Sequence, residues 1–203
     1  TDFARSVKGE VIASTFDLPP SDHTALAELA LERAKRLVEL GHDVVVLLDG
    51  ITRLTRAYNL AAPAGGRILA GGLDASAITP SKRLFGAARK VESGGSLTIL
   101  ATATTESAAE ADAAILEEFE GTANHEIRLR RELVEQGRFP SIDVQASATR
   151  RVDALIGEQQ QALVARLRDE VAHLEPAEAS AAFAARVKAT ASNVELLMAL
   201  SRS

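Results

Sequence analysis

The chain has 203 residues, of which 46% are hydrophobic and 25% are charged, and its formal net charge is −5. This length and apolar content support a globular domain with its own core and argue against disorder of the whole chain. The absence of Cys excludes disulfides, thiolate metal sites and a cysteine nucleophile, so we expect a cytoplasmic protein. No apolar run approaches the ~20 residues that span a bilayer, so no membrane association is expected. The acidic charge argues against a wholly basic nucleic-acid-binding surface.

The first half of the chain alternates between strand and helix patterns. Residues 9–16 are rich in β-branched side chains and predict a strand. A helix capped by Ser21 or Asp22 follows, with an apolar stripe at helical spacing that stops at Gly41. Asp43–Asp49 places five consecutive apolar residues between acids, which is typical of a parallel strand covered on both faces. The alternation predicts an α/β fold.

The next segments continue this alternation and then become helical. Residues 61–80 are rich in Gly, Pro and small residues and predict a long loop, a feature that is usually functional. A helix over 81–92 and a strand over 96–102 follow, and residues 104–120 are expected to run from a loop into an acidic helix. After Arg151 the predicted elements are all helices, namely 153–174, 177–190 and a last helix with a Ser192/Glu195 capping box.

Asp49 is the first candidate functional residue because it ends an apolar strand. The carboxyl edge of a parallel sheet is where open α/β folds bind ligands. A carboxylate there can order the water shell of a Mg²⁺ ion on nucleotide phosphates, since this hard cation prefers oxygen ligands. Such an Asp can equally cap the next helix, and the strand pattern alone favours neither interpretation.

Several motifs along the chain resemble the RecA-like ATPase domain of the Rho family of bacterial transcription termination factors. They are ITRLTRAYN (51–59), PAGGRILAGGLDAS (63–76), FGAARKVESGGSLTILAT (85–102) and SATRR (147–151). The resemblance runs without an insertion over essentially the whole chain. It implies an α/β fold with a RecA-like P-loop ATPase core, a parallel sheet flanked by helices and incomplete at its N-terminus. This core is expected over residues 1–151, and a helical C-terminal subdomain packed on it over 152–203.

The resemblance implies a site for ATP and Mg²⁺. Asp49 corresponds to the Walker B acid, which holds Mg²⁺ through water. Arg150 matches the arginine finger that a neighbouring subunit inserts toward the γ-phosphate; without the resemblance, a solvated arginine would be the favoured interpretation. Arg53, one helical turn past Asp49, is a candidate second phosphate or intersubunit arginine, with a salt bridge as an equal alternative. Phe139 resembles the aromatic that packs on adenine, and a core Phe is its alternative.

The resemblance also implies contacts with single-stranded RNA. Residues 64–72 resemble the family's Q-loop, which lines the pore of a hexameric ring. We single out Arg67, Ile68 and Gly72, because glycines permit close backbone approach and one Arg per subunit gives a track of cations along the phosphates. A flexible linker with an incidental Arg is the alternative. In the family's second RNA loop, Ser107 remains the only candidate contact.

This chain also departs from the family's pattern. Gly50 stands where Ser is usual and Gly137 where a basic residue is usual. Glu110 and Glu120 stand where Lys is usual, and an acid that faces phosphates repels them. The sequence also contains no G-x-x-x-x-G-K-[ST] P-loop, which lies further upstream in the family. We therefore expect a carboxyl-terminal piece of a longer protein, inactive as an ATPase by itself.

The first functional hypothesis is an ATP-dependent RNA translocase and RNA–DNA helicase that terminates transcription. It would act as a homohexameric ring with ATP, Mg²⁺ and single-stranded RNA, and RNA polymerase and elongation factors are expected partners. The alternative is a catalytically degenerate paralogue that serves as a binding or regulatory ring subunit. Glu110 and Glu120 favour this alternative, whereas the intact Asp49 and Arg150 oppose it. A RecA-like motor for protein export or proton-driven rotation is a third possibility that does not account for the glycine-rich loop.

Overall fold

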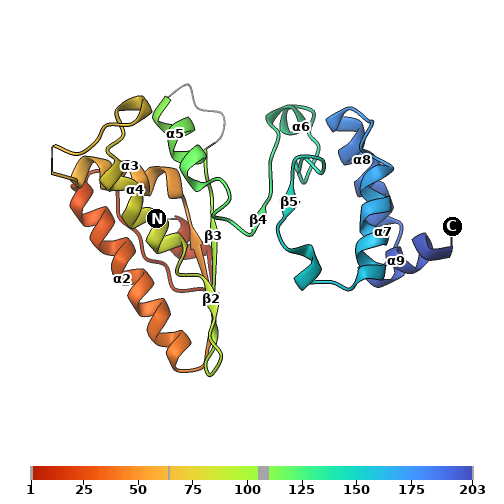
Figure 1. Cartoon of the computed structure of the whole chain (residues 1–203), viewed down its shortest axis with the longest axis horizontal. Helices are drawn as coiled ribbons and strands as arrows, with labels where there is room; N and C mark the ends of the chain where they lie inside the picture. Colours follow the sequence, from red (N-terminus) through yellow and green to blue (C-terminus); the bar gives the residue numbers. More distant parts are fainter. Residues whose placement is uncertain (1, 64, 105–109, 203) are drawn as a thin grey trace. The chain divides into compact units, whose positions relative to one another are not determined.

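The computed structural model describes residues 2–63, 65–104 and 110–202 (Figure 1). They form two compact units, Thr1–Thr122 and Ala123–Ser203. This division lies earlier in the chain than the domain boundary expected after residue 151, which remains a prediction. In the described part of the chain, no helix combines the length and the apolar character needed to cross a membrane.

The first unit is built around a small sheet. Strands β1 and β3 are parallel neighbours, with a register that runs from Asp43↔Ser96 to Leu48↔Ala101, and β2 pairs with β3 in the antiparallel direction. The α/β class and both predicted parallel strands are therefore confirmed. The elements are α1 (Asp2–Ser6), α2 (Pro20–Glu39), β1 (Asp43–Leu48), α3 (Ile51–Ala61), η1 (Ala70–Gly72), α4 (Ala75–Phe85), β2 (Arg89–Lys90), β3 (Ser96–Ala101) and α5 (Glu110–Phe119).

Helices α2, α3 and α4 gather on the same side of the strands (Figure 1). Because side chains alternate along a strand, Val44 and Val46 pack against this helical core while their neighbours point to the other face. There, Val45 and Leu47 are 60% and 66% exposed, and Leu100 of β3 is 55% exposed. The expectation that this strand is covered on both faces is therefore wrong for the described chain.

The segment 9–16 was expected to be a strand and forms none. It has no neighbouring strand among the described residues, so its β-branched side chains have no sheet to join. Instead, polar contacts attach it to α2: Glu10 forms an ion pair with Arg33 at 2.8 Å, and Ser14 shares a 2.6 Å hydrogen bond with the His23 ring. A tertiary contact has overridden the local propensity.

In the first unit, helix boundaries differ from the sequence prediction in two places. Helix α2 begins at Pro20, and its N-cap is Pro19, two or three residues before the predicted caps. A proline is accepted at the first helical position because it lacks only an N–H that would be unpaired there. Helix α4 begins at Ala75, within the predicted loop, because the Asp74 side chain accepts a hydrogen bond from Ser76 N. It ends at Phe85 rather than near residue 92, and the following residues join the sheet as β2.

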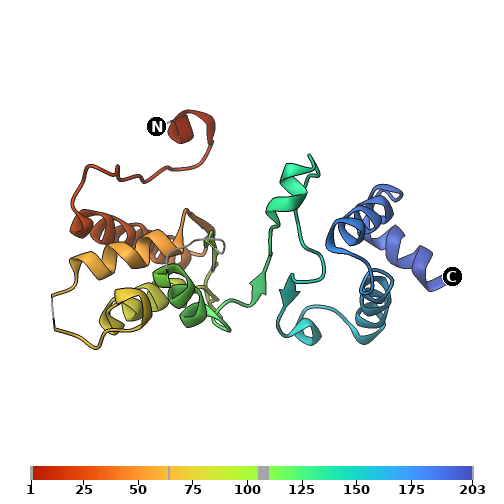
Figure 2. The ribbon, with the colours of Figure 1, turned by 90° about the horizontal axis from the view of Figure 1, so that it is seen from above.

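The second unit is mostly helical (Figure 2), and its described elements after Arg151 are all helices, as predicted. The helix expected over 153–174 is shorter than predicted, because only Glu158–Asp169 form it. Leu167, Leu196 and Leu200 form its apolar core. The predicted capping pair is present, since Ser192 Oγ accepts from Glu195 N at 3.3 Å, while Glu195 Oε2 accepts from Ala191 N at 2.8 Å. The elements are β4 (His125–Glu126), α6 (Arg131–Glu135), β5 (Ala148–Thr149), η2 (Val152–Ala154), α7 (Glu158–Asp169), α8 (Pro176–Lys188) and α9 (Asn193–Arg202).

The core between α4 and α5 provides a stability test. Ile115 is 0% exposed and belongs to the second apolar cluster of the first unit. Ile115→Ala is expected to lower the free energy of unfolding by about 2–5 kcal/mol, because it removes buried methyl groups and leaves a cavity. Leu29→Ala, at a position that is 64% exposed, is the matched control and is expected to change it by less than about 0.5 kcal/mol. Urea unfolding followed by circular dichroism measures both; equal effects would contradict the packing described.

Candidate functional site

Asp49 lies at the carboxyl edge of the β1–β3 pair. The parallel register continues past Leu48, where Thr102 N donates to the Leu48 carbonyl at 3.0 Å. Thr102 Oγ1 then donates to Asp49 Oδ1 at 2.8 Å, and the Asp49 side chain is exposed. The register thus fixes one carboxylate oxygen and leaves the group facing solvent at the edge where α/β folds bind ligands.

Gly50 is required by this arrangement. A Cβ atom at position 50 would lie 2.6 Å from Thr102 Oγ1 and 2.8 Å from the Thr102 carbonyl oxygen. That carbonyl also accepts from Ile51 N at 2.8 Å, so it is held in place. Gly50 stands where the Rho family usually has Ser, and the close approach of Thr102 explains why a residue without a side chain fits there.

The residues around Asp49 suit a hydrated Mg²⁺ ion. Mg²⁺ usually takes one or two protein carboxylates and completes its shell with water and phosphate oxygens. One exposed carboxylate, oriented by Thr102, provides such a ligand. Within residues 2–63, 65–104 and 110–202, no group of three His, Asp or Glu side chains forms a cage. An ion at Asp49 would therefore take most of its ligands from nucleotide and water.

Arg53 lies on α3 one turn after Asp49 and is exposed. The salt bridge considered as its alternative role is not formed within the described chain. The structure thus places this guanidinium in solvent near the sheet edge, and its role toward phosphate stays a prediction.

The glycine-rich loop is closed by its own backbone. Leu69 N donates to the Leu73 carbonyl at 2.7 Å, and Ala75 N donates to the Arg67 carbonyl at 2.9 Å. Arg67 and Ile68 project from this closed loop, and both are exposed. The loop is therefore built by specific hydrogen bonds, which does not fit the alternative of a flexible linker.

Asp74 anchors the base of the loop. It is only 7% exposed, and its two carboxylate oxygens accept from Gly66 N at 3.1 Å and Ser76 N at 2.8 Å. Its own N–H donates to the Asn59 side chain at 2.6 Å, which ties the loop to α3. The hydrogen bonds from Ser76, and then that from Gly66, hold the pKa of Asp74 below its usual value. The carboxylate is charged at neutral pH and joins the two ends of the loop.

Gly71 and Gly72 end the loop in left-handed backbone, with φ values of 69° and 75°. A Cβ at Gly71 would lie 2.3 Å from Ala111 N, so the loop packs directly against the first turn of α5. Whether Gly72 contacts RNA stays a prediction. The other predicted RNA contact, Ser107, lies outside the described residues.

A buried carboxylate organises the segment that leads to Arg150. Asp143 is 2% exposed and accepts hydrogen bonds from Gln145 N, Ala146 N and Arg130 Nε, the last at 2.5 Å. Burial alone would raise the pKa of Asp143, but the Ala146 N–H, the Arg130 guanidinium and the Gln145 N–H together hold it below its usual value. The carboxylate is thus compensated by donors from two sides.

Arg150 extends from this ordered segment. Ser147 Oγ accepts from Arg128 N at 3.0 Å, and the Ser147 carbonyl accepts from Arg168 of α7 at 2.9 Å. Strand β5 pairs with β4, and Arg150 N donates to the Asn124 carbonyl at 2.9 Å. The backbone of Arg150 is held firmly while its side chain is exposed, a suitable arrangement for an arginine that reaches out of its own subunit.

Phe139 is 69% exposed. It is therefore not a core side chain, which was the alternative interpretation of this residue. The preceding Arg138 donates to the Ala177 carbonyl of α8 at 3.0 Å, which fixes the backbone beside it. An exposed aromatic ring on an anchored segment can stack on a base, and its contact with adenine stays a prediction.

Sequence reasoning missed Thr102, Asp74 and Asp143. Asp74 could have been found from the Asp-x-Ser pattern that begins α4, whereas only the sheet register joins Thr102 to Asp49. For Asp143 no sequence signal distinguishes a buried hub from a solvated acid. The departures Glu110, Glu120 and Gly137 are all exposed.

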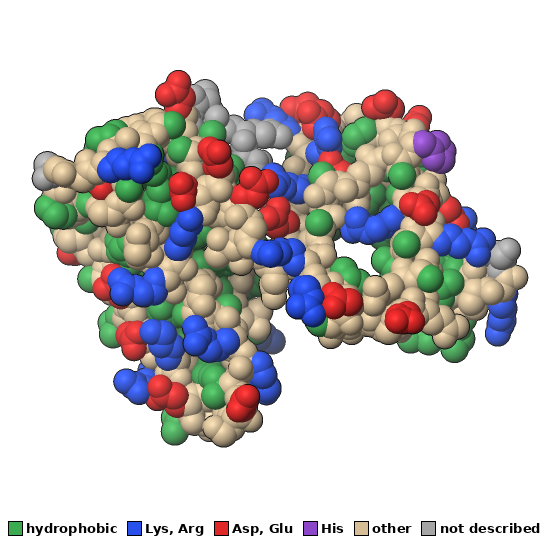
Figure 3. Space-filling model, viewed as in Figure 1, with side chains coloured by type: hydrophobic (Ala, Val, Ile, Leu, Met, Phe, Trp, Pro, Cys, Tyr) green, Lys and Arg blue, Asp and Glu red, His purple; other side chains and the backbone are tan. Residues whose placement is uncertain are grey.

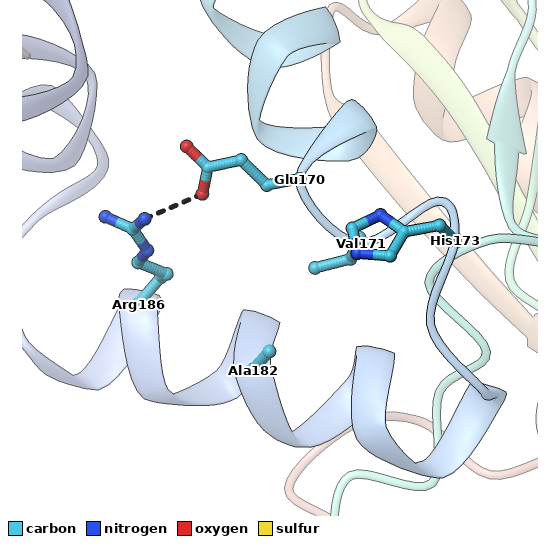
Figure 4. Close-up of a pocket in the computed structure, with 5 residues that line it drawn as sticks. All are labelled: Glu170, Val171, His173, Ala182 and Arg186. Atoms are coloured by element: carbon cyan, nitrogen blue, oxygen red, sulfur yellow. Dashed lines mark hydrogen bonds and ion pairs between the residues drawn. The ribbon is translucent and has the colours of Figure 1, made fainter.

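The described face shown in Figure 3 and one hollow of the second unit add no further site residues. Acidic and basic side chains are interspersed over the face of the first unit that Figure 3 shows. In the second unit, a hollow of about 460 Å³ contains none of the predicted site residues (Figure 4). Its charged pair is already formed, since Glu170 and Arg186 lie 2.8 Å apart. Its lining residues are Glu170, Val171, His173, Ala182 and Arg186.

An acid at the carboxyl edge of two parallel strands, with helices packed on them, is the arrangement in which open α/β folds bind ligands. Residues 5–149 match the nucleotide-binding domain of the ATP synthase alpha/beta family, and the chain belongs to this family. The predicted fold class is thereby confirmed.

Curated relatives of the chain carry the name transcription termination factor Rho. The chain is 58% identical, over all 203 residues, to the transcription termination factor Rho of Micrococcus luteus and 56% identical to that of Streptomyces lividans. It spans 29% of the length of each of these relatives. The Rho protein of Chromobacterium violaceum is 48% identical over 95% of the chain, which spans 46% of that protein. The resemblance to the Rho family is confirmed.

Solved structures share the fold. An ATPase from the type III secretion system of pathogenic bacteria superposes with a TM-score of 0.73 at 21% identity, over 93% of this chain and 62% of its own. The ATPase EscN of enteropathogenic E. coli, assembled with its central stalk EscO, gives a TM-score of 0.68 at 25% identity, over 78% and 37%. These similarities define the architecture of the chain.

The Asp143 hub generates a pH-dependent prediction. Asp143→Asn is expected to lower the free energy of unfolding at pH 7 by about 1–3 kcal/mol, because it removes a charged acceptor of buried hydrogen bonds. Since the folded pKa lies below the unfolded value of about 4, this contribution is complete above that value and is lost as the pH falls through the folded pKa. The difference between wild type and variant should therefore narrow below pH 4.

The matched control is Asp153→Asn, because Asp153 is exposed and pairs with Arg151. Its effect on unfolding should stay below about 0.5 kcal/mol. Chemical unfolding of all three proteins between pH 3 and pH 7 provides the measurement. A difference for Asp143→Asn that does not change with pH would show that the carboxylate is not stabilised as described.

Proposed function

We propose that this chain is the Walker B, RNA-loop and arginine-finger portion of an ATP-dependent RNA translocase and RNA–DNA helicase that terminates transcription. The observation that carries this proposal is the identity of 54–58% with proteins named transcription termination factor Rho over the full chain. The chain covers a minor part of those proteins, so their activity comes to it by inference. The glycine-rich loop, closed by its own hydrogen bonds, supports the same function.

In this proposal, Asp49 works at the nucleotide. Mg²⁺ bound with ATP would neutralise charge on the phosphates. The Asp49 carboxylate holds the water shell of the ion, and Thr102 fixes the orientation of that carboxylate by donating to Oδ1. Phe139 would stack on the adenine, and Arg53 would meet a phosphate or an acid of the next subunit.

Arg150 acts from the neighbouring subunit. Its guanidinium would approach the γ-phosphate and stabilise the charge that develops as the bond to the leaving group breaks. The backbone hydrogen bonds around Ser147 and Asn124 hold the arginine in place and so reduce the entropy lost on reaching the phosphate. Such a composite site requires a ring of identical subunits, expected as a homohexamer.

The glycine-rich loop grips RNA in the pore of the ring. Arg67 supplies one cation per subunit to the phosphates, and Ile68 supplies an exposed apolar contact. Gly72 would allow the backbone to approach the RNA closely, and Ser107 would donate or accept a hydrogen bond. RNA polymerase and elongation factors would be partners of the whole protein in the cytoplasm.

The degenerate ring subunit is the second candidate. Glu110 and Glu120 favour it, because both place an acid where the family usually has a cation. The oriented Asp49 and the anchored Arg150 oppose it. The export motors are a weaker match, because their similarity is 21–25% identity whereas the Rho proteins reach 58%.

The test is ATP hydrolysis by the protein extended upstream to the length of its Rho relatives, with and without cytidine-rich RNA. Arg150→Ala is expected to lower kcat roughly 10³-fold or more, because an arginine finger contributes that much. Arg67→Ala is expected to reduce the stimulation by RNA and to flatten the salt dependence of RNA binding by about one unit of slope per contact, because one phosphate contact is lost.

Two matched variants serve as controls. Arg151→Gln removes the neighbouring arginine, which is paired with Asp153, and Arg36→Gln removes an arginine paired with Glu39 on α2. Both should leave hydrolysis and its stimulation nearly unchanged. If RNA does not stimulate hydrolysis, or if the wild type does not hydrolyse ATP, the result would favour the degenerate ring subunit instead.

A further inference from the structure

The first turn of α5 contacts segments of both predicted sites, namely helix α3 after Asp49 and the glycine-rich loop. The Asp112 side chain on this turn is 5% exposed, and its Oδ1 lies 2.5 Å from Nη2 of Arg56 on α3. Arg56 follows Asp49 by seven residues, on the helix that begins directly after the nucleotide edge. One ion pair therefore joins the helix of the Walker B acid to α5.

The glycine-rich loop rests on the same turn. A Cβ at Gly71 would lie 2.3 Å from N and 2.5 Å from Cα of Ala111, the residue before Asp112. No side chain separates the two backbones at that point. A shift of the first turn of α5 must therefore displace Gly71 and, with it, the glycine-rich loop.

The Arg56–Asp112 ion pair is suited to hold α3, the first turn of α5 and the glycine-rich loop in one arrangement. A buried carboxylate is costly unless it is paired, so Asp112 must follow the Arg56 guanidinium when α3 moves. The position of Asp112 in the first turn of α5 also places its negative charge at the favourable end of the helix dipole. Packed segments joined in this way shift between discrete arrangements rather than deforming continuously.

We propose that Arg56 and Asp112 are positioning residues that couple the state of the nucleotide at Asp49 to the RNA-gripping loop around Arg67. This inference rests on the proposed function for what the two sites bind. The path runs from Asp49 through α3 to Arg56, across the ion pair to Asp112, and through the Ala111 backbone to Gly71. Neither residue of the pair touches nucleotide or RNA.

The experiment measures ATP hydrolysis, with and without cytidine-rich RNA, by the protein extended upstream to the length of its relatives. In Arg56→Gln and Asp112→Asn, the hydrolysis without RNA should stay within about twofold of wild type, while the stimulation by RNA falls about tenfold, within the usual range of coupling between sites. Arg56→Lys should retain most of the stimulation, because it keeps the charge.

A double-mutant cycle isolates the pair. Arg56→Gln combined with Asp112→Asn should lose no more stimulation than either single variant, since both remove the same interaction. Lys82→Gln is the matched control, because Lys82 pairs with Glu118 at the other end of α5, at 2.7 Å. It should keep the stimulation of wild type. Additive losses, or an equal loss in the Lys82 control, would overturn the proposal.

Amide hydrogen exchange distinguishes this proposal from the proposed function. In Arg56→Gln, exchange should become faster in the loop residues 65–74 and in the first turn of α5, and Lys82→Gln should leave both unchanged. This comparison requires no activity. If the wild type shows no stimulation by RNA, the proposed function fails, and unchanged exchange in Arg56→Gln would overturn the coupling independently.

Discussion

The parallel pairing of β1 with β3 is the constraint on which the first unit depends. Its register carries Thr102 to the level of Asp49, so the hydroxyl of one strand orients the carboxylate that ends the other. The same register brings β3 so close to position 50 that only Gly fits. Helix α3 starts at this point, and the segment after β3 leads to α5. Both α3 and the segment that leads to α5 therefore originate from one edge of two strands.

Buried carboxylates, rather than apolar side chains, shape the candidate functional segments. Asp74 closes the glycine-rich loop, Asp112 joins α3 to α5, and Asp143 folds the segment before Arg150. Each is nearly buried and is compensated by backbone N–H groups or an arginine, because a buried charge without such partners is unfavourable. The apolar clusters hold the helices on the sheet, whereas these carboxylates fix the conformation of the loops through hydrogen bonds and ion pairs.

The sequence predicted the elements whose signal is local. The apolar run before Asp49, the stripe of α2 and the capping pair of α9 needed no tertiary information. Residues 9–16 were mispredicted because a strand needs a partner, and α4 because the Asp74 cap outweighs the unfavourable Pro80 within the helix. Asp49 was predictable from its position after a strand. Its partner Thr102 was not, because the two are 53 residues apart and only the sheet register joins them. The Arg56–Asp112 pair is hidden for the same reason, since both residues look like solvated helix charges in the sequence.

The central claim is that Asp49 and Arg150 complete one ATP site from two different subunits. The most direct measurement is single-turnover ATP hydrolysis by rings assembled from a mixture of Asp49→Asn and Arg150→Ala subunits, in the protein extended to the length of its relatives. Each variant alone should be inactive. The mixed rings should recover hydrolysis, because some interfaces then combine an intact Asp49 with an intact Arg150. Mixed rings as inactive as the pure ones would contradict a site shared between subunits.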